Sequence, residues 1–208
     1  MPPTDEDLDR LAVLEAVARE RRSNLRVDPD RPVADDLVDR LLDIAATAPN
    51  HRRTFPWRFR VVTGEGRAAL GEALADDLAE WGDPEAKVVK ARTKYLRAPT
   101  ILVIASRAGT SPTMTAENRD AVAAAIQGLL LGATAVGLAS YWSTGAAMDS
   151  PRIAALCGLD PDDRLVGIVY LGWPVEEPPT IERPRPEVVR LTGADPVPAP
   201  GPSHIVED

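Results

Sequence analysis

The stretch from Ala116 to Gly137 constrains the fold more than any other part of the sequence. It is rich in alanine and leucine, contains no proline, and carries apolar residues around most of a helical circumference. A helix of this kind is buried or packs against a partner. The apolar run 99–105 has the length and pattern of a strand buried on both faces, and 165–172 has the pattern of a second strong strand. The sequence therefore predicts a covered helix together with a sheet whose central strand is 99–105.

Hydrophobic periodicity predicts the other elements. A capping box of Thr4 and Asp7 begins a first helix that ends at an arginine-rich segment. Ser150 and Pro151 begin a short helix, because proline is favoured at the first helical position. The remaining expected elements are helices over 37–48, 70–81 and 84–97 and strands over 59–63 and 138–142.

Length and composition favour one compact domain. A chain of 208 residues with 44% hydrophobic residues can bury one sizeable core. We assign residues 1–193 to a single domain and expect the proline-rich stretch 194–208 to be a disordered tail. Cys157 is the single cysteine, so an intrachain disulfide and a cysteine cluster for zinc are both excluded, and we expect no metal site.

Charge and hydropathy narrow the range of partners. The net charge of -8 weighs against a polyanion such as DNA or RNA as the main partner. No apolar run approaches the ~20 residues that a membrane-spanning helix needs, and the N-terminus lacks a basic region followed by an apolar stretch. The sequence thus predicts a cytoplasmic protein that binds neither nucleic acid nor membrane.

Two short polar clusters are the best candidates for a ligand site. Arg21, Arg22 and Ser23 end the first expected helix, and a Pro-Asn-His-Arg segment containing His51 ends the second. Arginine forks and a serine hydroxyl suit a phosphate, and a histidine can hydrogen-bond a polar ring. Together they predict a site for flavin mononucleotide, FMN. Taken singly, the arginines could merely stabilise a helix C-terminus, and His51 could merely bond backbone.

The common nucleotide and hydrolase motifs are absent. There is no Gly-x-Gly-x-x-Gly after the first strand, no Walker-type loop, no His-Glu-x-x-His and no Gly-x-Ser-x-Gly elbow. The segment 64–67 resembles a phosphate loop only superficially and is better interpreted as a turn that begins a helix. The chemistry is therefore expected to come from a cofactor, with no catalytic side chain assigned.

These features in their order along the chain resemble the FMN-dependent nitroreductase family, particularly its short members. The resemblance rests on Arg-Arg-Ser at 21–23, Ala-Pro-Asn-His at 48–51, Pro-Trp at 56–57, Arg-Ala-Pro at 97–99, Trp-Ser-Thr-Gly-Ala at 142–146, Leu-Gly-Trp-Pro at 171–174 and Arg-Pro-Arg-Pro at 183–186. It implies an α+β fold with a central, mostly antiparallel sheet flanked by helices. It also implies an intertwined homodimer with FMN sites at the subunit interface. In each site we expect the two polar clusters to form one half of the pocket, and the loop at 142–144 of the partner subunit to form the other half.

The resemblance also implies roles for particular residues. The phosphate and ribityl chain of FMN would be bound by Arg21, Arg22 and Ser23, helped by Arg183 and Arg185. The flavin ring would be contacted by Thr47 and His51 and by the loop Trp142, Ser143 and Thr144. The nicotinamide donor is associated with Gly132, Ala133, Thr134, Ala135, Val136 and Gly137.

The implied reaction is a two-electron transfer in two halves. A hydride passes from NADH or NADPH to flavin N5, and reduced flavin then reduces a small acceptor such as a nitroaromatic or quinone. Thr47 and Ser143 stand where arginines are common in the short members of the family. The reduction potential of the flavin, or the preference between NADH and NADPH, could therefore differ from that of those members. An FMN-sequestering protein with little reductase activity is the alternative. Reductive dehalogenation or flavin fragmentation is a third, although the segment 81–97 looks short for the lid of such enzymes.

Overall fold

A computed structural model of the chain describes residues 1–176, 178 and 180–191, in two units over 1–178 and 179–208. Residues 180–191 of the second unit carry no helix or strand, and the expected tail 194–208 lies outside the described residues. The division into domains therefore stays a prediction. The elements of the first unit are α1 (Asp5–Glu20), α2 (Asp35–Ala46), η1 (His51–Arg53), β1 (Trp57–Val62), α3 (Gly66–Glu80), α4 (Glu85–Thr93), η2 (Lys94–Arg97), β2 (Thr100–Ser106), α5 (Pro112–Ala135), β3 (Ala139–Ser143), η3 (Ala146–Asp149), α6 (Pro151–Leu156) and β4 (Arg164–Gly172).

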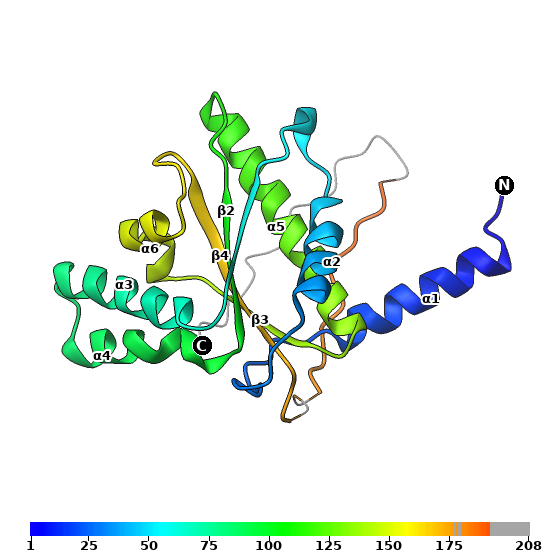
Figure 1. The fold of residues 1–208 in the computed structure, drawn as a ribbon. Coiled ribbons are helices and arrows are strands. Elements are labelled where there is room, and N and C mark those ends of the chain that lie inside the picture. Colours follow the sequence, from blue (N-terminus) through cyan, green and yellow to red (C-terminus); the bar gives the residue numbers. More distant parts are fainter. Residues whose placement is uncertain (177, 179, 192–208) are drawn as a thin grey trace. The chain divides into compact units, whose positions relative to one another are not determined.

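The strands form one sheet in the order β1-β2-β4-β3, and every neighbouring pair is antiparallel (Figure 1). All residues of β2 are buried, as the continuous apolar run predicts for a central strand. Val103 on β2 lies opposite Arg60 on β1 and Ile168 on β4. The expected α+β fold with a mostly antiparallel central sheet is confirmed.

Helices cover both faces of this sheet. Because side chains of a strand alternate between faces, β2 serves two cores. Leu102 and Ile104 pack with residues of α2 and α5, whereas Ile101 and Val103 pack with residues of α3, α4 and α6. The sheet is therefore the middle layer between α2 and α5 on one side and α3, α4 and α6 on the other (Figure 1).

The buried helix α5 begins earlier than the sequence predicts. The expected start at Ala116 is wrong, because Ser111 caps the helix by accepting from the amide of Met114 at 3.2 Å. Pro112 then occupies the first turn, where its missing N–H costs nothing. Leu129 and Ala133 are fully buried, as the apolar pattern predicts. Within the described part of the chain, no helix combines the length and hydropathy that a membrane span requires.

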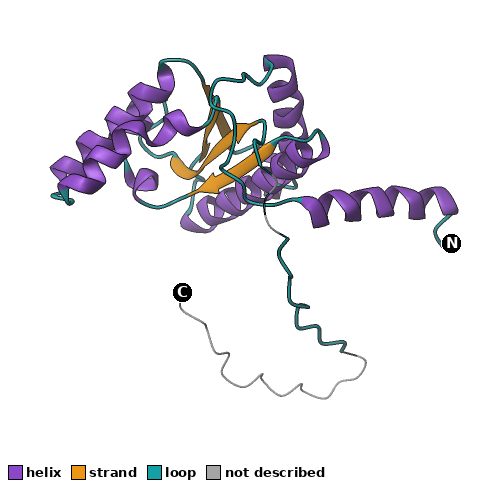
Figure 2. Ribbon diagram, turned by 90° about the horizontal axis from the view of Figure 1, so that it is seen from below, coloured by secondary structure: helices purple, strands orange, loops and turns teal. Residues whose placement is uncertain are grey.

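Helix α1 has the predicted capping box but no buried residue. The side chain of Thr4 accepts from the amide of Asp7, and the side chain of Asp7 accepts from the amide of Thr4. Leu8, Leu11 and Leu14 recur at helical spacing yet are each about half exposed. Figure 2 shows α1 extending away from the sheet and its covering helices. Within the described residues of one copy, these leucines of α1 are therefore not covered.

Candidate functional site

The arginine cluster lies where α1 ends and the chain turns toward the sheet. Arg21 is the C-cap residue of α1, and the guanidinium of Arg22 donates to the carbonyls of Arg19 and Arg21, the latter at 3.0 Å. Ser23 is exposed and forms a parallel bridge with Ser140, the second residue of β3. The amide of Asn24 donates to the carbonyl of Ser140 at 2.9 Å. The cluster is thereby held against the beginning of β3.

Ser140 itself carries an orphaned polar group at this place. Its side chain is buried, and its hydroxyl has no hydrogen-bond partner among the described residues. Buried hydroxyls usually have a partner, because desolvation without one is costly. The half-buried residues Arg21 and Arg22, the exposed Ser23 and this unpartnered hydroxyl of Ser140 together fit an anionic, hydroxyl-rich ligand such as the phosphate and ribityl chain of FMN.

The C-terminal end of α5 lies next to this cluster, since β3 begins only a few residues later. Of the residues associated with the nicotinamide donor, Gly132 and Ala133 are buried. A Cβ atom at Gly132 would lie 2.9 Å from Leu41 Cδ2, so this position faces α2. Thr134 donates its hydroxyl to the carbonyl of Leu130 at 2.9 Å. The exposed members of the set are Ala135, Val136 and Gly137.

The loop after β3 is positioned by the packing of Trp142. Its indole lies on Gly167 of β4, where an added Cβ would come within 2.0 Å of Nε1. The same Nε1 donates to the carbonyl of Val166 at 3.4 Å. Ser143 is half-buried, and its hydroxyl donates to the carbonyl of Thr144 at 3.4 Å. Thr144 is exposed. Because residue 167 is a glycine, the indole of Trp142 can pack against it and position the loop of Ser143 and Thr144, which is expected to lie at the flavin ring.

Gly167→Ala is expected to displace Trp142 and lower the free energy of unfolding by about 1–3 kcal/mol, as overpacking does. Gly128→Ala on α5 is the matched control, because its Cβ would meet neighbours only at 3.6 Å or more and alanine favours a helix. Urea denaturation of both variants measures the effect. Equal stability of the two variants would contradict the role of Gly167.

The His51 loop follows α2 and is anchored to the N-terminal part of α5. Thr47 is the C-cap of α2 and donates its hydroxyl to the carbonyl of Ile44 at 2.7 Å. His51 is half exposed, with Nδ1 3.6 Å from Oε1 of Glu117 on α5. Thr54 donates to Oδ1 of the buried Asn118 at 2.7 Å. Two α5 side chains therefore position this loop.

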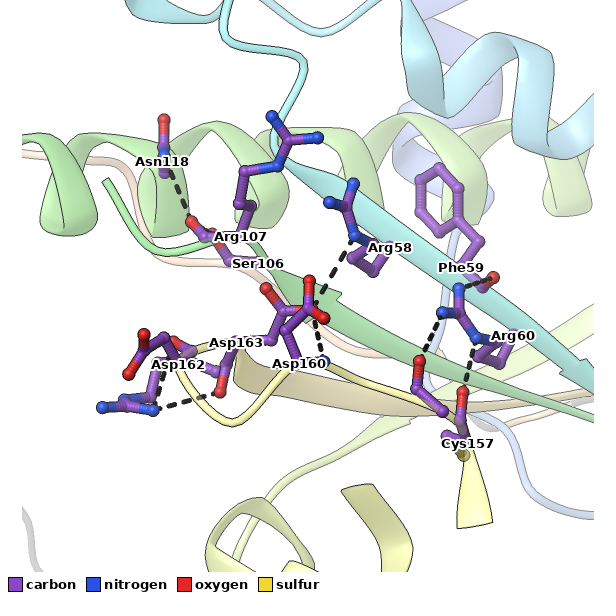
Figure 3. Close-up of polar contacts among 12 residues, drawn as sticks. Arg58, Phe59, Arg60, Ser106, Arg107, Asn118, Cys157, Asp160, Asp162 and Asp163 are labelled. Carbon is purple, nitrogen blue, oxygen red and sulfur yellow. Dashed lines mark hydrogen bonds and ion pairs between the residues drawn. The ribbon is translucent and has the colours of Figure 1, made fainter. Parts of the chain in front are cut away.

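Asn118 also holds the loop between β2 and α5. Its Nδ2 donates to the carbonyl of Arg107 at 3.1 Å, a contact that Figure 3 shows beside Arg58 and Ser106. Because Oδ1 and Nδ2 of Asn118 each have a partner in a different loop, one side chain ties both loops to the helix. No sequence motif marked Asn118 or Glu117. Their polarity does not single them out either, because Thr115, Arg119 and Asp120 in the same part of α5 are polar as well.

Within one chain, the arginine cluster and His51 do not share a site, so the expectation that the two clusters together form one half of the pocket is wrong. Ser23 lies beside Ser140, just beyond the C-terminal end of α5, whereas His51 lies beside Glu117 near its N-terminal end. At 1.5 Å per residue, the helical segment between 117 and 135 spans roughly 27 Å. The structure thus brings Arg21, Arg22 and Ser23 to the end of α5 near β3 and leaves Thr47 and His51 at the other end.

Arg183 and Arg185 lie in the second unit, where both are exposed. Their expected part in phosphate binding stays a prediction. In the described segments, no group of three or more His, Cys, Asp or Glu residues is gathered so that it could hold a metal ion.

The chain is similar in sequence and fold to several nitroreductases and nitroreductase-like proteins. A similar protein is the "Putative NAD(P)H nitroreductase YdjA" of Escherichia coli strain K12, with 29% identity over 155 residues that cover 74% of this chain and 84% of YdjA. A solved nitroreductase-like family protein from Bacillus cereus matches with a TM-score of 0.70 and 29% identity over 83% of this chain and 91% of the other. A mutant of the FMN and NADPH-dependent nitroreductase NfnB from Sphigopyxis sp. strain HMH matches with a TM-score of 0.68 and 24% identity, covering 86% of this chain and 99% of the other.

The comparison with family models decides the assignment. Residues 18–173 match the Nitroreductase family, a range that runs from the end of α1 to the residue after β4 and includes most of the candidate site. The predicted resemblance is therefore confirmed, and with it the expectation of an enzyme of the oxidoreductase class. This chain belongs to the nitroreductase family.

Proposed function

We propose that the protein is an FMN-dependent oxidoreductase that passes reducing equivalents from NADPH or NADH to a nitroaromatic, a quinone or a similar small acceptor. The proposal is supported by the family, by the name of YdjA, and by the FMN and NADPH dependence stated for NfnB. It is also supported by the buried hydroxyl of Ser140, which lies beside Ser23 and has no partner among the described residues. It keeps the sequence-based prediction of a cytoplasmic enzyme.

The distance along α5 between the arginine cluster and His51 is the main reason to propose a dimer. A cofactor bound by Arg21, Arg22 and Ser23 cannot also reach His51 of the same chain, because the part of α5 between 117 and 135 spans roughly 27 Å. A second copy of the chain would supply His51 and Thr47 to the first. We therefore propose a homodimer with composite sites, in which the exposed apolar residues of α1 pack against the partner.

In this arrangement each group of residues has a physical task. The guanidinium groups of Arg21 and Arg22 neutralise the phosphate, and the Ser23 hydroxyl donates to the phosphate or ribityl chain. Trp142, fixed on Gly167, sets the loop of Ser143 and Thr144 beside the ring. When bound, FMN supplies the ring that takes up a hydride and gives up electrons, so no side-chain nucleophile is required.

The test is the colour of the purified protein. We expect a yellow protein that loses its colour anaerobically when NADPH or NADH is added and regains it with a quinone or nitroarene. A yellow protein that neither nicotinamide bleaches would contradict the reductase. A colourless protein that takes up no FMN would contradict every flavin-based function.

FMN sequestration is the second candidate, favoured by the two short side chains at 47 and 143. The hydroxyl of Thr47 is directed to the carbonyl of Ile44, and the hydroxyl of Ser143 to the carbonyl of Thr144. Neither position offers a positive charge to a reduced, anionic ring. The bleaching experiment separates the two candidates, because sequestration gives a yellow protein without turnover.

Replacing Leu11 and Leu14 with glutamate is expected to give a monomer that no longer retains FMN, because charges in an apolar interface are not tolerated. Light scattering coupled to size-exclusion chromatography measures the mass, and flavin absorbance measures the cofactor. Val89→Glu on α4 is the control, since Val89 is a similarly exposed apolar residue away from α1. A dimeric double variant with full FMN content would contradict this interface.

A further inference from the structure

The segment from Asn50 to Phe55 has a strained backbone. Arg52, Arg53 and Phe55 have φ values of 55°, 54° and 45°, in the left-handed region that residues other than glycine rarely adopt. They are the non-glycine residues with positive φ in the described structure. A glycine at 52 or 53 would adopt this conformation without steric cost, yet the sequence places arginine at both positions.

The surrounding contacts hold the strained conformation in place. Oδ1 of Asn50 accepts from the amide of Phe55 at 3.0 Å, and its Nδ2 donates to the carbonyl of Ala48 at 3.3 Å. Thr54 is bound to the buried Asn118. Strain that is maintained by several independent contacts is typical of sites where the conformation serves a function.

The strained backbone carries Arg52, whose guanidinium lies beside His51, and the neighbouring Arg53. Nε of Arg52 donates to Nε2 of His51 at 3.1 Å, and the two Nη groups of the same guanidinium are further donors that this bond does not use. Both arginines are exposed, and neither forms an ion pair with a described carboxylate. The nearby carboxylate of Glu117 lies instead at Nδ1 of His51. The loop is therefore a local concentration of positive charge in a chain of net charge -8.

We propose that Arg52 and Arg53 bind the carboxylate of a negatively charged aromatic acceptor and so determine acceptor specificity. The inference rests on the proposed function, in which His51 lies at the flavin ring where the acceptor has to stack. The planar Nη fork of an arginine matches a carboxylate in bidentate geometry, and its position next to His51 places that carboxylate at the rim of the ring site. A neutral acceptor of the same shape gains nothing from this contact.

The test compares 4-nitrobenzoate with 4-nitrobenzamide, which has nearly the same shape without the charge. We expect the dimeric, FMN-loaded wild type to favour the carboxylate in kcat/KM. The double variant Arg52→Gln, Arg53→Gln should lose about tenfold in the ratio of the two kcat/KM values, mainly through KM for the carboxylate. Arg40→Gln, which removes one exposed charge from α2, should keep the wild-type ratio. An unchanged ratio in the double variant, or a change confined to KM for NADPH, would overturn the proposal.

A second measurement separates this inference from the proposed function. Titration with benzoate and benzamide, followed by tryptophan fluorescence, measures binding without turnover. If no acceptor is turned over but benzoate binds more tightly than benzamide in an Arg52- and Arg53-dependent way, the reductase is contradicted and the carboxylate site is supported. If neutral acceptors are turned over and both ligands bind equally, the carboxylate site alone is contradicted.

A structural role for the two arginines makes the opposite prediction for stability. Arg52→Gly and Arg53→Gly relieve the left-handed strain, so the melting temperature should rise while the preference for the carboxylate falls. Arginines that were present only to stabilise the loop would give a lower melting temperature in both variants, and that result would also overturn the proposal.

Discussion

Arg22→Ala is expected to weaken FMN binding about a hundredfold, as measured by the fluorescence of free flavin in equilibrium titrations. A charge-assisted hydrogen bond to a phosphate contributes about 1.5–3 kcal/mol, and each 1.4 kcal/mol corresponds to a factor of ten in affinity. The guanidinium of Arg22 lies at the end of α1 next to Ser23 and the unpaired hydroxyl of Ser140. Its loss removes one of the charges that we assign to the phosphate of FMN.

The side chain of Arg22 also donates to two carbonyls of the last turn of α1, so a structural effect has to be separated from a binding effect. The last turn of α1 has no buried residue, and the proposed contacts of α1 with the partner lie earlier in the helix, at Leu11 and Leu14. Fraying of the last turn should therefore leave the urea midpoint of the apoprotein nearly unchanged. Arg10→Ala removes an exposed arginine from the same helix and should retain wild-type affinity. Equal affinities for FMN in the two variants would exclude Arg22 from the phosphate site.

Asp77→Asn is expected to lower the free energy of unfolding by about 2–3 kcal/mol, through weakened hydrogen bonds of a buried carboxylate. Asp77 on α3 is fully buried and accepts from the hydroxyl of Ser150, from the amide of Arg152 at 3.2 Å and from the guanidinium of Arg152. Ser150 in turn caps α6 by accepting from the amide of Ile153 at 3.0 Å. One carboxylate thus connects α3 to the beginning of α6.

This cluster also predicts a pH dependence. Burial raises the pKa of Asp77, but the hydrogen bonds from Ser150 and Arg152 and the charge of Arg152 outweigh it, so that the pKa lies below its usual value. A carboxyl with a lower pKa in the folded state stabilises the protein above its unfolded pKa of about 3.9. That stabilisation is lost as the pH falls below about 4 and through the folded pKa.

Urea denaturation at pH 7 and at several values below pH 4 measures both effects. The difference between wild type and Asp77→Asn should be largest at pH 7 and should shrink in acid. Asp76→Asn, at the exposed neighbouring position on α3, should change the stability by less than about 0.5 kcal/mol. If the difference in unfolding free energy between the wild type and Asp77→Asn stays constant down to pH 2, the charge of Asp77 is not the stabilising feature.

The local elements were predictable because their signals are local. Thr4 and Asp7 form the capping box that their spacing predicts, and Ser150 caps α6 with Pro151 in the first turn. The fully apolar β2 is buried along its whole length. The start of α5 was missed because Ser111 and Pro112 belong to a loop-like segment without apolar periodicity, so that only the cap marks the boundary.

Other features depended on contacts between distant segments. Nothing in the sequence around Gly167 shows that the indole of Trp142 occupies the space above it. Asn118 carries no motif, and its role follows only from the loops of Thr54 and Arg107 meeting on α5. The left-handed arginines at 52 and 53 contradict local preference and exist because neighbouring side chains hold them.

The sequence by itself determined the helices and strands, the family and the residues that suit a phosphate and a ring, because periodicity, caps and functional groups are properties of short segments. Only the tertiary structure decided that Arg22 and His51 lie at opposite ends of α5 and that the described residues of one copy leave the apolar stripe of α1 uncovered. Arg22 and His51 are fewer than thirty residues apart in the sequence. They are far apart in space because each lies at a different end of the long helix α5. The same separation is the physical reason to expect the site between two copies.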